Sequence, residues 1–172
     1  MPGELADEHV VAICQVLSAH HVSFVIIGGI AARLHQTGYA TVDVDICPAR
    51  DESNLGNLAA ALRALGARLR VAGDPDGLEF DPHPDMLRQV TTMTLITAHG
   101  PLDLCFAPDG FAAGYDALRA HSVVITIADT AIPVASLEDV IVSKRAAGRA
   151  KDIVALPELE AYLRRREAGH GA

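Results

Sequence analysis

The stretch FVIIGGIAARLHQTGYATVDVDI, from Phe24 to Ile46, constrains the fold more than any other part of the chain. Its four leading apolar residues are typical of a short buried strand, which runs directly into Gly28 and Gly29. The next residues, IAARLHQ, have helical spacing, and Gly38 is placed to end that helix. TVDVDI then alternates strictly, which predicts a second strand with one apolar and one acidic face. The segment therefore predicts a strand–helix–strand unit of an α/β domain.

The rest of the chain shows further helix and strand patterns. Helices are expected at 5–20, about 53–65 and 110–121, and strands at 67–71, 91–97, 101–106, 122–127 and 132–135, with 91–97 and 101–106 forming a hairpin. Ser136, with Asp139 three residues later, resembles a capping box for a helix that Gly148 ends. Pro157 is expected at the first position of a last helix. The stretch 72–89 is rich in Pro, Asp and Gly, which predicts a loop with at most one helical turn.

These elements predict an α/β (α+β) fold, in which helices flank a mixed sheet. We expect a single domain over residues 1–172, with a core at about 20–135 and a helical C-terminal cap at about 136–167. A chain of 172 residues is long enough to bury its own core. Because only 4% of the residues are aromatic, that core must be filled by Ala, Val, Leu and Ile.

Composition argues against several classes of protein. No apolar run approaches the roughly 18 residues that span a bilayer, and the acidic start MPGELADEHVV lacks the basic region of a secretory signal. The three cysteines form no CxxC pair, which is typical of buried thiols in a reducing compartment. The net charge of -8 argues against non-specific coating of nucleic acid, although basic residues cluster between Lys144 and Arg166. We therefore expect a cytoplasmic protein with no membrane partner.

Asp43 and Asp45 are the first candidates for chemistry. Two residues apart on one strand, they would project from the same face with Cα atoms roughly 6.5–7 Å apart. Carboxylates at that separation can share two divalent cations, which lie about 3.5–4 Å apart in two-metal sites. Mg²⁺ prefers oxygen ligands and often takes others from substrate phosphates, and Mn²⁺ could replace it. Asp103, between Leu102 and Leu104, is the candidate third ligand, because a charge on an interior strand is costly unless it meets a cation.

The glycine pair lies at the start of the predicted helix that precedes these aspartates. Gly28 and Gly29 allow the backbone to approach a ligand closely. The helix that follows would direct its free N–H groups and the positive end of its dipole toward the same place. This arrangement predicts a seat for a triphosphate.

The glycine pair, the helix, the DVD strand and the later strand acid together resemble the DNA polymerase β-like nucleotidyltransferase superfamily. Within it the chain is similar to the minimal bacterial branch that includes toxin nucleotidyltransferases of the abortive-infection, type IV toxin–antitoxin kind. The tail VASLEDVIVSKRAAGRAKDIVALPEL is similar to that branch's helix, in which a Lys and a Lys-Asp pair recur. The resemblance covers about residues 20–160. One departure is Tyr39, in a position where relatives often carry an Arg shortly before the Asp pair.

The resemblance implies a role for each candidate residue. Asp43 and Asp45 would hold both metals, and Asp103 would bind the metal that activates the acceptor hydroxyl. The remaining implied roles concern the nucleotide. Gly28 and Gly29 would cradle the β- and γ-phosphates, and Lys144 would steady the triphosphate. Lys151 and Asp152 would line or brace the cleft.

The reaction implied is in-line attack of an acceptor on the α-phosphorus of a nucleoside triphosphate, with release of pyrophosphate. Metal charge and positioning would supply most of the catalysis. The resemblance leaves the acceptor open between a tRNA 3′ end, a protein hydroxyl and a small molecule. If the protein is a toxin, a cognate antitoxin is the expected partner.

Each of these patterns also has a purely structural interpretation. Asp43 and Asp45 could form the solvated face of a strand, and the glycines could be only a tight connection. At the level of function, one alternative is a catalytically idle module that holds a nucleotide or a partner protein. A second alternative is a metal phosphohydrolase, which usually adds His ligands, but none of the eight histidines falls in HxH or HExxH spacing.

Overall fold

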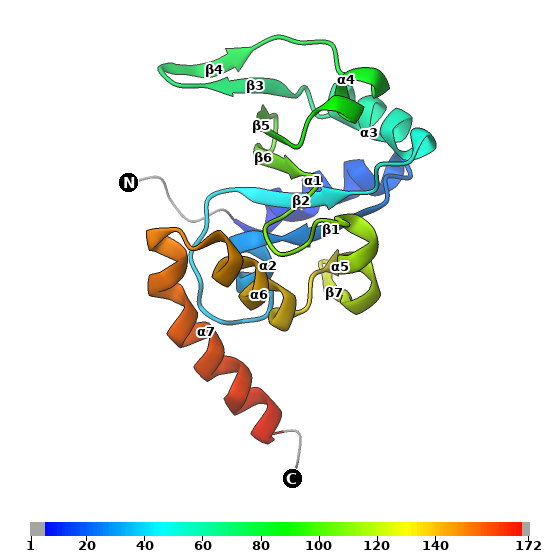
Figure 1. Cartoon of the computed structure of the whole chain (residues 1–172). Coiled ribbons are helices and arrows are strands. Elements are labelled where there is room, and N and C mark those ends of the chain that lie inside the picture. Colours follow the sequence, from blue (N-terminus) through cyan, green and yellow to red (C-terminus); the bar gives the residue numbers. More distant parts are fainter. Residues whose placement is uncertain (1–5, 170–172) are drawn as a thin grey trace.

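The computed structural model describes residues 6–169 of the chain. Eight strands form one sheet in the order β4-β3-β5-β6-β2-β1-β8-β7, and helices pack around it (Figure 1). The strands are β1 (Phe24–Ile27), β2 (Val44–Pro48), β3 (Arg68–Val71), β4 (Asp74–Leu78), β5 (Thr92–Thr97), β6 (Gly100–Cys105), β7 (Val123–Ile127) and β8 (Thr130–Val134). The helices are α1 (Asp7–Ala19), α2 (Gly28–Leu34), α3 (Glu52–Ala64), α4 (Pro84–Gln89), α5 (Tyr115–His121), α6 (Leu137–Ala147) and α7 (Ala150–Gly169).

The sheet is mixed, and β1 lies near its centre. This strand pairs antiparallel with β2 and parallel with β8, and all four of its residues are buried. Helices α1 and α3 cover the core with fully buried side chains such as Ile13, Leu17 and Leu58. Burial of apolar surface of this kind contributes roughly 25 cal/mol per Å². The predicted mixed sheet with flanking helices is therefore confirmed, and it provides a rigid frame for the ends of β1, β2 and β6.

Side-chain caps fix the starts of α3 and α6, as their sequences predict. The carboxylate of Asp51 accepts a hydrogen bond of 2.9 Å from the N–H of Asn54. The hydroxyl of Ser136 accepts one of 3.1 Å from the N–H of Asp139. Gly148 follows α6 with a φ of 59°, in the left-handed conformation that ends many helices. Local contacts therefore set where both helices begin and where α6 ends.

The prediction of a loop at 72–89 is wrong. Asp74–Leu78 is the second strand of the β3–β4 hairpin, and Pro84–Gln89 is the short helix α4, where the prediction allowed one helical turn. The turn of the hairpin is at 72–73, and Asp74 supports the start of β4, because its Oδ1 accepts hydrogen bonds from the N–H groups of Asp76 and Gly77. Gly77 has a φ of 69°, and a Cβ atom there would lie 2.6 Å from the carbonyl oxygen of Leu69. Residues that usually mark loops therefore build a tightly paired edge strand.

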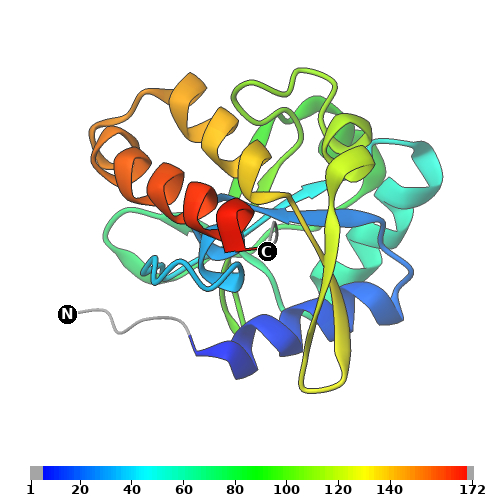
Figure 2. The ribbon, with the colours of Figure 1, turned by 90° about the horizontal axis from the view of Figure 1, so that it is seen from below.

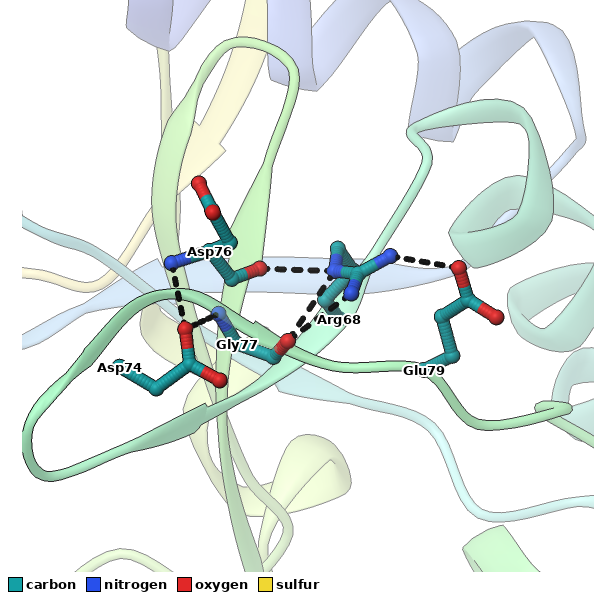
Figure 3. Close-up of polar contacts among 5 residues, drawn as sticks. All are labelled: Arg68, Asp74, Asp76, Gly77 and Glu79. Atoms are coloured by element: carbon teal, nitrogen blue, oxygen red, sulfur yellow. Dashed lines mark hydrogen bonds and ion pairs between the residues drawn. The ribbon is translucent and has the colours of Figure 1, made fainter.

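Arg68 cross-links this hairpin through its guanidinium group (Figure 3). Its Nε donates to the carbonyl oxygen of Asp76 at 2.7 Å, and its Nη2 donates to that of Gly77 at 3.0 Å. Its Nη1 forms an ion pair with Glu79 at 2.9 Å. These contacts hold the backbone of β3 in place at this edge of the sheet.

The prediction that Pro157 begins a helix is also wrong, because α7 runs unbroken from Ala150 to Gly169. A proline inside a helix removes one backbone hydrogen bond. Here buried Asp152 and Leu159 anchor the helix on both sides of the proline. Figure 2 shows α7 alongside α6, which supports it over much of its length. Among the described residues, no helix is long and apolar enough to cross a membrane.

Candidate active site

The two central acidic residues of the site lie side by side on neighbouring strands. Asp45 in β2 is the direct partner of Asp103 in β6, and on its other side it pairs with Ile27 at the end of β1. Asp43 lies in a bend one residue before β2 begins, rather than within the strand as the alternation predicts. The sheet therefore brings the three predicted carboxylates to one place, two of them on strands and one on the connection that enters β2.

Gly28 occupies the point where β1 turns into α2, next to these carboxylates. Its φ is 66°, which side chains rarely tolerate. A Cβ atom at this position would lie 2.5 Å from Oδ2 of Asp45. At Gly29 a Cβ atom would lie 2.9 Å from Cε1 of Tyr39. The first turn of α2 therefore approaches the acidic strand and the Tyr39 segment closely because both residues are glycines.

A pocket of about 430 Å³ opens at this point. All eight residues that the sequence marks as candidates line it: Gly28, Gly29, Asp43, Asp45, Asp103, Lys144, Lys151 and Asp152. Arg149 lines the same pocket and was not among the candidates. The pocket thus has an acidic wall from the sheet and a basic wall from α6 and the start of α7.

Lys144 is the buried cation of the basic wall. Its Nζ donates to Oδ1 of Asp152 at 3.0 Å and to the hydroxyl of Tyr39 at 3.2 Å, and it lies 4.4 Å from the centre of the Tyr39 ring. Asp152 is only 2% exposed, and its second oxygen lies 3.0 Å from Nε of Arg149. Asp152 therefore joins α6 to α7 and fixes the direction of the lysine side chain.

The acidic wall carries unbalanced negative charge. Burial, followed by the charges of Asp103 and Asp43, raises the pKa of Asp45 to about 7, although Lys151 and Lys144 oppose the shift. Burial also raises the pKa of Asp103, and here Arg70 is the main opposing influence. A cation beside Asp45 would favour its charged form, against the burial and the neighbouring carboxylates that raise its pKa.

Arg70 on β3 is the functional candidate that sequence reasoning missed. Its Nη2 lies 2.9 Å from both carboxylate oxygens of Asp103, and its Nη1 lies 3.5 Å from Oδ2 of Asp43. In the pattern RLRV, the alternation of a regular strand would place Arg68 and Arg70 on one face, which is the signal that the sequence offers. It could not be used without the strand order, because β3 reaches β6 only through β5.

The donor set suits a divalent metal ion in its chemistry, although the oxygens are not gathered around one point. Within residues 6–169, no group of three or more His, Cys, Asp or Glu side chains is assembled to hold a metal. Two of the three carboxylates face Arg70 instead. Three carboxylates that line one pocket, beside a glycine that leaves space for Asp45, nevertheless fit an oxygen-loving cation such as Mg²⁺.

No protein-family model and no curated protein sequence matches the chain. Solved structures do match its fold. The lincosamide antibiotic adenylyltransferase LnuA, bound to lincomycin, has a TM-score of 0.59 at 15% identity, covering 92% of this chain and 98% of that chain. The antibiotic-resistance factor ANT(2″)-Ia in solution has a TM-score of 0.53 at 19% identity, covering 96% and 97%. The same factor in complex with adenylyl-2″-tobramycin has a TM-score of 0.53 at 16% identity, covering 92% and 90%. The chain is therefore similar in fold to nucleotidyltransferases.

Proposed function

We propose that this protein is a metal-dependent nucleotidyltransferase, which moves a nucleoside monophosphate from a nucleoside triphosphate to an acceptor hydroxyl and releases pyrophosphate. The observation that carries the proposal is the meeting of Asp43, Asp45 and Asp103 with Gly28 at one pocket. The similarity in fold to nucleotidyltransferases supports it. We also propose that the chain is a single cytoplasmic domain, in which α6 and α7 form a cap over a core of about residues 20–135.

The three aspartates are proposed to hold two Mg²⁺ ions, with Mn²⁺ as an alternative. Asp45 is the cross-strand partner of Asp103 and feels the charge of both other carboxylates, so it is the natural shared ligand. Asp103 belongs to the acceptor side, where a metal-bound carboxylate could help to take the proton from the attacking hydroxyl. When bound, the metals would neutralise the charge that develops on the transferred phosphoryl group.

The triphosphate is proposed to lie between the start of α2 and the basic wall. Gly28 and Gly29 let the backbone of α2 come close to the phosphates without side-chain obstruction. Lys144 and the exposed Lys151 supply positive charge from the opposite side of the pocket. Asp152 positions Lys144 rather than touching the nucleotide, because both of its oxygens are engaged with cations.

The acceptor that we favour is the hydroxyl of a small molecule. The fold neighbours act on or hold such compounds, lincomycin in one case and an adenylylated tobramycin in the other. The net charge of -8 also weakens the case for a polyanionic acceptor such as tRNA. The tRNA end, the protein hydroxyl and the role of a toxin with a cognate antitoxin are retained as outcomes of the experiment.

Label transfer tests this function. The protein is incubated with Mg²⁺ and each α-³²P nucleoside triphosphate in turn. A small-molecule extract, total RNA or a protein lysate is added in separate reactions as the source of acceptor. The variants Asp43→Asn and Asp103→Asn are tested in the same way. A labelled product that needs Mg²⁺ and disappears in both variants establishes the transferase, and the fraction that carries the label identifies the acceptor class. Nucleotide binding that is unchanged in EDTA, with no label in any fraction, would instead establish the idle binding module.

A further inference from the structure

The carboxylates proposed to hold metal already have a cation beside them. Leu69 of β3 pairs with Leu95 of β5, and Arg70 is the next residue along β3, at an irregularity in the pairing of β3 with β4. Thr94 of β5 pairs with Asp103, and Asp103 pairs with Asp45. Thr94, Asp103 and Asp45 therefore form a row across three strands, and Arg70 reaches the acidic wall from the strand beyond them.

The backbone beneath Arg70 is held firmly. Arg68, two residues earlier on β3, ties the strand to its hairpin partner through four contacts with Asp76, Gly77 and Glu79 (Figure 3). The direction from which Arg70 approaches is therefore fixed by the hairpin. The guanidinium group itself sits at the end of a long flexible side chain, which can leave the carboxylates without any movement of the strand.

The contact of Arg70 with the two carboxylates is closer and less exposed than an ordinary surface ion pair. One Nη of Arg70 reaches both oxygens of Asp103 at 2.9 Å, and the other reaches Asp43 at 3.5 Å. The side chains of Asp103, Asp43 and Arg70 are only 20%, 26% and 33% exposed. Charge-assisted bonds in such partly buried positions are stronger than exposed pairs. They engage the same oxygens that a metal ion would need.

We propose that Arg70 is a resident counter-cation, which neutralises Asp43 and Asp103 in the metal-free protein and which divalent metal ions must displace in order to bind. This inference rests on the proposed function, because it takes these carboxylates to be the metal ligands. Arg70 thereby sets the metal concentration at which the site becomes loaded. It also relieves the repulsion among three carboxylates that share one pocket wall.

Titration with Mn²⁺ alone tests the proposal, with free Mn²⁺ followed by electron paramagnetic resonance. Arg70→Met removes the competing cation and is expected to tighten Mn²⁺ binding by about tenfold or more. Arg70→Lys keeps the charge but not the planar guanidinium group, so its Mn²⁺ affinity is expected to equal that of the wild type or to exceed it by up to about threefold. Lys151→Met is the matched control: it removes an exposed pocket cation that forms no ion pair with the carboxylates among the described residues, so we expect a change of about threefold at most. Asp45→Asn should weaken binding in either background, which assigns the bound ion to this site.

The possible outcomes distinguish a failure of this inference from a failure of the proposed function on which it rests. Wild-type binding that Arg70→Met leaves unchanged, or shifts no more than Lys151→Met does, overturns the role of Arg70 and leaves the metal site standing. Binding by Arg70→Met but not by the wild type supports the proposal in its strongest form. Absence of Mn²⁺ binding in every protein overturns both the role of Arg70 and the proposed metal site. If Arg70→Met does not fold, a Mn²⁺ affinity of Arg70→Lys weaker than that of the wild type overturns the proposal, because lysine competes less well than the bidentate guanidinium.

Discussion

A Cβ atom on Gly28 would lie 2.5 Å from Oδ2 of Asp45. The helix that starts at Gly28 and the strand that carries Asp45 therefore depend on one another: the helix can begin where it does only because Gly28 has no side chain to displace the carboxylate. The φ of 66° at Gly28 adds a second reason for glycine at this position. The pair links the strand–helix turn directly to the proposed metal ligand.

Gly28→Ala is expected to abolish label transfer, because the new methyl group would push the carboxylate of Asp45 out of place. Gly38→Ala is the matched control, since Gly38 also has a positive φ, of 76°, but nothing lies within 4 Å of its Cβ position. Both substitutions should cost about 1–2 kcal/mol of unfolding free energy through backbone strain. A comparison of label transfer by the two variants separates the effect of the clash with Asp45 from the effect of backbone strain. Activity in Gly28→Ala comparable to that of Gly38→Ala would show that the close approach has no catalytic importance.

The stability of the metal-free protein should fall as the pH rises toward 8. The pKa of Asp45 is raised from 3.8 to about 7 by burial and then by the neighbouring carboxylates. Between these two values the folded state keeps a proton that the unfolded state has lost, so unfolding releases a proton and a higher pH favours it. Below pH 3.8 both states are protonated, and above about 7 the destabilisation is complete. The raised pKa of Asp103 acts in the same direction.

Asp45→Asn has no carboxylate to ionise at this position. The difference between its free energy of unfolding and that of the wild type should therefore shift in favour of the variant, by on the order of 2 kcal/mol between pH 5 and pH 8. Urea unfolding in EDTA at the two pH values measures this difference. Asp76→Asn, at an exposed position of β4, controls for the removal of a carboxylate as such. An advantage of Asp45→Asn that is the same at both pH values would contradict the shifted pKa.

The parts of the site that sequence predicts are close together along the chain. β1, the glycine pair, α2 and β2 follow one another directly, so the strand–helix–strand pattern alone places Gly28 near Asp45. Lys144 and Asp152 could be placed only through the family resemblance, and the structure lines the same pocket with them. Arg70 was not predictable from periodicity, because its contact with Asp103 depends on the order of strands in the sheet and on the reach of a long side chain.

The β3–β4 hairpin shows why part of the fold was missed. The sequence of β4, DPDGL, has no apolar alternation and contains residues that are rare in strands. Its pairing is supported by polar contacts instead, from Asp74 to two backbone N–H groups of β4 itself and from Arg68 across the hairpin. Helix α7 is a second example, because its packing against α6 outweighs the tendency of Pro157 to interrupt a helix. In both cases contacts between elements decide the structure.

The buried pair of Lys144 and Asp152 should contribute more to stability than an exposed pair on the same helices. Their side chains are 8% and 3% exposed, so Lys144→Met leaves a buried carboxylate with only Arg149 as a partner and should cost about 3 kcal/mol of unfolding free energy. Arg145→Met, which breaks the pair with Glu160 at 63% and 32% exposure, should cost less than about 1 kcal/mol. Urea unfolding of both variants gives the comparison. The double variant Lys144→Met/Asp152→Leu should be less destabilised than the sum of its single variants, because it leaves no unpaired charge between α6 and α7. Equal costs for Lys144→Met and Arg145→Met would mean that the two helices are joined by apolar packing alone.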